Sequence, residues 1–173
     1  IALDTLGITI RLNDGKTGAI SVGARTLNSS TATMRGESTR TDSSSLLSVR
    51  PAEITTGGSR WLLAGNADVR SGGRRMTLDS LVMLNGRGGR LALSGDVPDS
   101  GRAQFAMRAD SLPLTDIANL GQFRTPLAGW ATIVAVGAGT KAAPVLNSDA
   151  RFSGLRYGDL RLEEAKLRGT YAA

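Results

Sequence analysis

Few residues of this 173-residue chain belong to the types that carry out chemistry, and those few are poorly placed for it. Cys and His are both absent, which excludes thiol nucleophiles, disulfides, Cys/His metal sites and triads with a His base. Glu163 and Glu164 are adjacent, so on a strand their carboxylates point to opposite faces. The serines at 29–30 and 43–45 have no nearby base. We therefore predict no catalytic residue, no bound metal and no cofactor.

Two glycine-rich stretches resemble phosphate- or nucleic-acid-binding motifs. Residues 137–141 have the glycines of a phosphate-binding loop but lack its GKS/T ending and the following helix. Residues 87–89 form one Arg-Gly-Gly tripeptide, which functional RNA-binding tails repeat. It lies between the apolar runs 81–84 and 91–93, where a hairpin needs residues that tolerate positive φ. We predict a hairpin turn here and no nucleic-acid partner.

The charge of the chain is compatible with several kinds of partner. The net charge is +6, and nearly all basic residues are Arg. This balance suits an anionic lipid surface or nucleic acid, and a GC-rich genome would produce the same preference for Arg. The chain begins at Ile1 without Met, signal peptide or membrane span, so we expect residues 1–173 to be a single β-rich segment of a longer protein, with any membrane contact outside it.

Alternation of apolar and polar residues with period two recurs along nearly the whole chain. Short strands separated by turn signals predict an all-β, antiparallel, multi-stranded sheet. The alternation leaves open whether the sheet closes as a barrel, pairs as a sandwich or curls into an open apolar trough. The sparse aromatic residues include Trp61 and Trp130, which lie in apolar strands and are expected to pack in a core or line the trough wall.

Four local features refine this prediction. Leu114, Ile117 and Leu120 have helical spacing, so a short helix is expected near 114–120, capped by Thr115 or Asp116. A change of apolar phase across residues 79–80 predicts a bulge. Pro51 is expected to end a strand or mark an edge. The polar stretch 28–45 is expected to form a loop that contains at most a weak strand.

From Trp61 onward, the order of elements resembles the AsmA-like superfamily, in particular TamB-type proteins. The carriers of the resemblance are the small-residue strand after Trp61, the helix motif at 112–120 and the unit that follows it. In that unit Leu127-Ala128-Gly129 opens a strand, Gly139-Thr140 with Pro144 carries the connection, and Tyr157-Gly158-Asp159-Leu160 leads into the next strands.

The resemblance implies a β-taco-like groove in the periplasm, within an envelope-spanning protein anchored in the inner membrane. It also implies a non-enzymatic role in phospholipid transfer between inner and outer membranes, with acyl chains as partners. Assembly of outer-membrane β-barrel proteins by strand-edge pairing is the alternative, and a closed β-sandwich binding module is another.

We predict the groove lining from the in-phase apolar positions, which could equally fill a closed core. They are Leu6, Ile8, Ile10, Ile20, Val22, Leu47, Val49, Leu63, Val69, Leu78, Leu91, Leu93, Phe105, Met107, Val134, Val136, Leu146, Phe152, Leu162 and Leu167.

Overall fold

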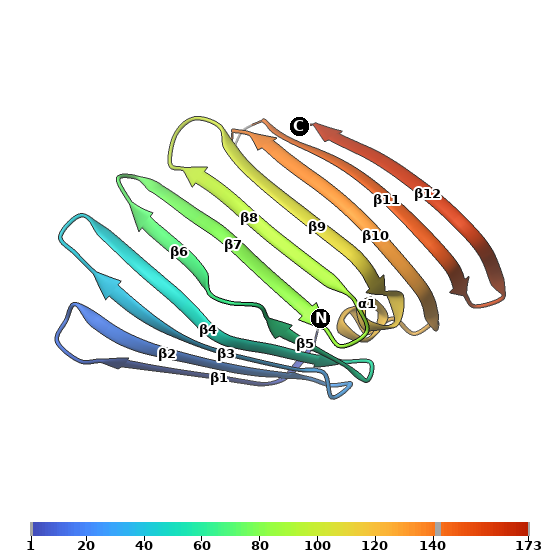
Figure 1. Cartoon of the computed structure of the whole chain (residues 1–173), viewed down its shortest axis with the longest axis horizontal. Coiled ribbons are helices and arrows are strands. Elements are labelled where there is room, and N and C mark those ends of the chain that lie inside the picture. Colours follow the sequence, from blue (N-terminus) through green and yellow to red (C-terminus); the bar gives the residue numbers. More distant parts are fainter. Residues whose placement is uncertain (1, 141–142, 173) are drawn as a thin grey trace.

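A computed structural model describes residues 2–140 and 143–172 as one antiparallel 12-stranded sheet with a single short helix (Figure 1). The strands in chain order are β1 (Leu3–Leu12), β2 (Thr17–Thr26), β3 (Thr31–Arg40), β4 (Ser44–Thr56), β5 (Ser59–Leu63), β6 (Ala67–Gly72), β7 (Arg75–Asn85), β8 (Arg90–Pro98), β9 (Ala103–Pro113), β10 (Leu127–Gly139), β11 (Pro144–Tyr157) and β12 (Leu160–Ala172). The helix α1 (Leu114–Gly121) lies between β9 and β10 in the chain. The predicted all-β class is confirmed.

The sheet is an open meander in which successive strands pair, except that β5 and β6 do not pair with each other. The short strands β5 and β6 share one position, between β4 and β7, and β1 and β12 occupy the two ends. Because the described strands form one sheet with free ends, neither the closed barrel nor the two-sheet sandwich is adopted. Figure 1 shows that the sheet bends, so that β1–β4 are turned relative to β7–β12.

Two local predictions are confirmed by the strand pairing. The Arg-Gly-Gly segment lies in the β7–β8 hairpin, where the Asn85 Oδ1 atom accepts hydrogen bonds from the backbone N–H of Arg87 at 2.9 Å and of Gly89 at 2.7 Å. Asn85 thus stabilises the turn through side-chain to backbone hydrogen bonds, which are typical of Asn and Asp in turns. The register between β7 and β8 shifts between Leu78 and Leu81, where the bulge was expected.

Three other local predictions are wrong in part. The helix forms, but Pro113 occupies its N-cap position and no side chain makes a cap bond. Pro51 neither ends β4 nor lies at an edge, because β4 continues to Thr56 between β3 and β5. The polar stretch 28–45 contains the regular strand β3, whose alternation is too weakly apolar to stand out in the sequence. Lys141 of the glycine-rich segment lies outside the described residues.

The helix defines the two faces of the sheet. Trp61 of β5 donates a hydrogen bond from its Nε1 atom to Asp116 Oδ2 of α1 at 2.8 Å, so α1 covers the face that carries the Trp61 side chain. The helix also contacts β4, β9 and β10, which lie on both sides of the bend (Figure 1). We call the face covered by α1 the inner face and the opposite one the outer face.

Irregularities in the hydrogen-bond ladder line up across the middle of the sheet. The register shifts between Met34 and Gly36 in the β3–β4 pair, and between Leu78 and Leu81 in the β7–β8 pair. Between them, residues 64–66 separate β5 from β6. This line of irregular pairing, which we call the crease, crosses the strands from β3 to β8.

Candidate functional site: the apolar inner face

The inner face is mainly apolar, and every strand contributes to it. Strand pairing fixes its composition, because directly paired residues of antiparallel strands project their side chains to the same side. The row that contains Ile8 illustrates this, since Ile8 pairs with Val22 and Val22 pairs with Met34. Among the paired positions of this face from β1 to β10, Arg40 is the only ionisable residue.

Most of the predicted lining residues share this face. The register places on it Leu6, Ile8, Ile10, Ile20, Val22, Leu47, Val49, Leu63, Val69, Leu78, Leu91, Leu93, Phe105, Met107, Leu146, Phe152 and Leu167. The sequence prediction missed Ile54, Met83 and Ile133 on the same face. Ile133 could have been found, because it belongs to the apolar run of β10. The prediction instead chose the alternate positions Val134 and Val136 of that strand.

Three predicted lining residues lie on the outer face instead. Val134 pairs with Arg108 and Asp149, and Val136 pairs with Ala106 and Asn147. Leu162 pairs with Leu155, and it lies two residues before the outer-face Glu164 of the same strand. Trp130 also lies on the outer face, where it is 40% exposed, so of the two tryptophans that were predicted to pack in a core or line the trough wall, only Trp61 is buried on the inner face.

Exposure of the inner face differs from residue to residue across the sheet. Met83 and Ala109 are buried, at 3% and 0% exposure. The aliphatic row of β1 is exposed, with Ile8 at 59% and Ile10 at 61%. Phe105 is 45% exposed, although its ring lies against Gly137, where an added Cβ would meet the ring at 1.8 Å. Exposed apolar surface is typical of interaction sites in proteins.

Beneath α1, the inner face changes from apolar to polar. Thr26, Ser30, Thr56, Ser59 and Asn85 are all buried at the strand ends that lie near the helix. The hydroxyls of Ser30 and Thr56 are 3.0 Å apart, and the Ser30 N–H donates to Thr26 Oγ1 at 3.1 Å. This polar cluster borders the apolar surface at one end of the strands.

The helix is held over the cluster by bonds to the first half of the chain. The Gln122 side chain donates to the Ala2 carbonyl at 2.7 Å and accepts from the Ala2 N–H at 3.0 Å. Asn28 donates its side-chain amide to the Asn119 carbonyl. Asp116 is 1% exposed; its Oδ2 atom accepts the hydrogen bond from Trp61, and its Oδ1 atom has no hydrogen-bond partner among the described residues. Three separate contacts thus fix α1 across the bend.

The outer face is polar and carries the ion pairs of the sheet. Arg75 donates from Nε to Asp96 Oδ1 at 2.6 Å, and this hydrogen bond holds the pKa of the Asp96 carboxyl below its ordinary value. The Arg108 guanidinium lowers the pKa of Asp110 in the same way, across an Nε–Oδ2 distance of 2.9 Å. Similar pairs join Arg60 to Glu53 and Arg168 to Asp149.

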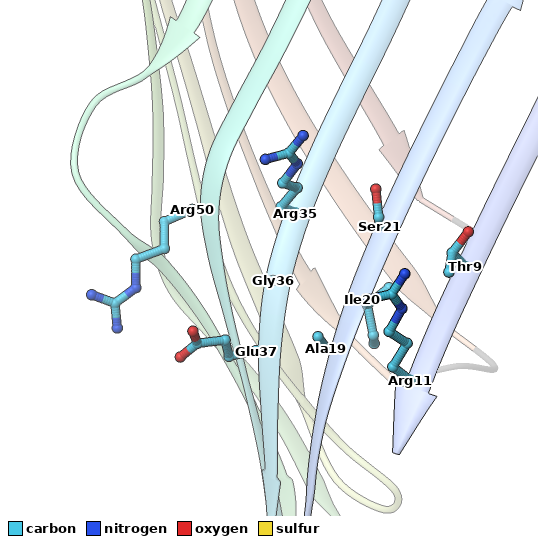
Figure 2. Close-up of a pocket in the computed structure, with 9 residues that line it drawn as sticks. All are labelled: Thr9, Arg11, Ala19, Ile20, Ser21, Arg35, Gly36, Glu37 and Arg50. Atoms are coloured by element: carbon cyan, nitrogen blue, oxygen red, sulfur yellow. The ribbon is translucent and has the colours of Figure 1, made fainter. Parts of the chain in front are cut away.

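One hollow on the outer face is lined by unpaired guanidinium groups (Figure 2). It has a volume of about 540 Å³ and is formed by the first four strands. Its charged lining residues are Arg11, Arg35, Glu37 and Arg50, and within the described residues none of them belongs to an ion pair. The basic hollow therefore has free positive charge.

No group of three acidic side chains that could hold a metal ion occurs among the described residues. The helix of residues 114–121 is too short to cross a membrane, and the described part of the chain contains no other helix. Comparison of the chain with protein-family models, curated proteins and solved structures gave no match.

Proposed function

We propose that the inner face carries the acyl chains of phospholipids, and that the chain is a segment of an envelope protein that moves them through the periplasm between the inner and outer membranes. The observation that carries this proposal is a mainly apolar face that runs in register across the sheet, is nearly free of ionisable groups from β1 to β10 and includes exposed side chains such as Ile8 of β1 and Leu167 of β12. A face whose only role was to form a core would be covered by a second layer, and α1 covers only one end of it.

The energetics of lipid transfer favour a surface of this kind. Exposing an acyl chain to water costs about 0.8 kcal/mol per CH₂ group, so a chain of roughly 16 carbons costs on the order of 10 kcal/mol. An aliphatic surface removes much of this cost by covering apolar area. Since aliphatic side chains make no directional contacts, the lipid can also move along the surface and leave it.

Photo-crosslinking from adjacent residues tests the proposal. Ile133 and Val134 are neighbours in β10 and are both aliphatic, but they project to the inner and outer faces respectively. Leu93 and Ala92 form a second such pair in β8. With a photoreactive residue at each position in the protein expressed in cells, we expect phospholipid adducts at 93 and 133 and none at 92 and 134. Equal adducts on both faces, or none at 93 and 133 in a folded protein, would exclude the proposal.

Strand-edge pairing with an outer-membrane β-barrel client is the second proposed function, and the difference between the two edges favours it. The end strand β12 carries Arg161, Glu163, Glu164, Lys166 and Arg168, and charges of this kind discourage pairing with another strand. Residues 5–10 of β1 carry no charge, so a client strand would add there. Proline at a β1 position whose N–H points away from β2 would remove client capture, and proline in β12 would not.

A further inference from the structure

We propose that the corner of the sheet formed by β1, β2, β3 and β4 docks on an anionic phospholipid surface, with Arg11, Arg35 and Arg50 contacting lipid phosphates. This surface contact goes beyond transfer on the inner face and does not require it. Its basis is the combination of the basic hollow with the exposed aliphatic row of β1.

The hollow is built by small residues flanked by long ones. On the outer face, β2 contributes Ala19 and Ser21. Ala19 pairs with Arg11 of β1, and Ser21 pairs with Arg35 of β3. The long side chains of the flanking strands therefore stand above a floor of small residues, and Gly36 extends that floor. A phosphate group on this floor would be within reach of guanidinium groups from both sides.

The charge of the hollow favours anions. Three guanidinium groups and one carboxylate, Glu37, line it, and all four side chains are exposed. By contrast, Arg75 and Arg108 on the same face are neutralised by Asp96 and Asp110. Each basic residue near an anionic membrane surface contributes about 1 kcal/mol to binding, provided that its charge is not already paired.

The arrangement of the side chains favours a surface with several phosphates over a single ion. Figure 2 shows that Arg11, Arg35 and Arg50 come from different strands and point in different directions. Such a spread suits phosphates on separate lipid molecules. None of the lining residues is aromatic, so the hollow lacks the stacking groups that single-stranded nucleic acids use.

The same corner offers an apolar anchor. Leu6, Ile8, Ile10 and Leu12 of β1 are 56%, 59%, 61% and 73% exposed on the inner face, directly behind the hollow. An element with basic residues on one face and aliphatic residues on the other is suited to the boundary between lipid headgroups and acyl chains. The aliphatic row would enter the acyl region, while the guanidinium groups remain at the phosphates.

Vesicle flotation of the 173-residue protein tests the proposal. The vesicles contain equal parts of phosphatidylglycerol and phosphatidylcholine, and the variant is R11Q/R35Q/R50Q. The control R75Q/R108Q/R168Q also removes three positive charges, but from ion-paired positions on the same face. We expect the first variant to lower vesicle affinity roughly 100-fold and the control to lower it less than about tenfold. An equal loss for both variants would overturn the proposal.

Three further arms make the test specific. The variant I8S/I10S, which keeps every charge, is expected to weaken binding as well, and unchanged binding would overturn the apolar part of the proposal. Displacement from vesicles by inorganic phosphate at constant ionic strength would show a free-anion site instead. Tighter binding to a single-stranded oligonucleotide than to vesicles would also overturn it. Lipid adducts at Ile133 are scored separately, so failure here and failure of the transfer proposal are distinguishable.

Discussion

The strands β7–β10 and the strands β1–β4 share one pattern of alternation but differ in how their side chains are partnered. In β7–β10, the inner face includes buried residues such as Met83, and the outer-face Arg75 and Arg108 are ion-paired. In β1–β4, the inner-face Ile8 is exposed, and Arg35 has no acidic partner among the described residues. Alternation thus assigns a residue to a face, and its neighbours decide whether it stabilises the fold or remains free to bind.

Truncating one inner-face side chain in each half gives the largest expected difference. Met83→Ala removes buried apolar volume and is expected to lower the free energy of unfolding by about 2–5 kcal/mol. Ile8→Ala removes a side chain that is mostly exposed, so the expected loss is below about 0.5 kcal/mol. Urea unfolding measures both. Similar losses at the two positions would mean that β1 is packed as tightly as β7.

Loss of the Trp61–Asp116 hydrogen bond, which joins α1 to β5, is expected to have the next largest effect on stability. Trp61→Phe keeps most of the buried ring but leaves both carboxyl oxygens of Asp116 without a partner. We expect a loss of about 1–3 kcal/mol in the free energy of unfolding, together with faster amide hydrogen exchange in α1. Trp130→Phe, on the exposed outer face, serves as the control and is expected to change neither quantity. Unchanged exchange in α1 would show that this bond does not hold the helix.

The smallest effect concerns the ion pairs of the outer face. The folded-state pKa of Asp96 is lowered by Arg75, so the stability that this pair contributes is present above the unfolded-state pKa and is lost as the pH falls through the folded-state pKa. Arg75→Gln is expected to return the carboxyl pKa toward its ordinary value in an NMR titration and to reduce the loss of stability in acid. Arg35→Gln, at a position without an ion pair, is expected to leave the loss of stability in acid unchanged. A low carboxyl pKa that persists in Arg75→Gln would refute the assignment.

The strand phase could be predicted from sequence wherever one phase alone is apolar. Leu6, Ile8 and Ile10 alternate with polar or small residues, and their face was assigned correctly. In β10, both phases are apolar, because Ile133 and Val134 are adjacent. The choice there depends on pairing with β9 and β11, which one strand does not encode. Leu162 was misassigned for a related reason, since β12 carries leucines in both phases.

The polar end of the inner face could not be predicted from local sequence. Asp116 reads as a helix cap, but its carboxyl instead accepts a hydrogen bond from Trp61, which lies 55 positions earlier in the chain. Ser30 and Thr56 likewise meet across 26 positions. Their residue types are those of ordinary turns. The β3–β4 register, which pairs Thr31 with Thr55, places Ser30 next to Thr56, and α1 brings Asp116 to Trp61. Long-range packing therefore carries the information that the sequence pattern lacks.

The crease gives the sheet a direction of low bending stiffness. A regular sheet resists bending along a line that crosses its strands, because the backbone hydrogen bonds of neighbouring strands must distort together. Along the crease this pairing is already interrupted between β3 and β8. Bending there leaves the ladders on either side intact. Because the crease crosses the strands, it separates the strand ends near α1 from the opposite ends, and it marks where the sheet between β3 and β8 can bend with the least distortion of its ladders.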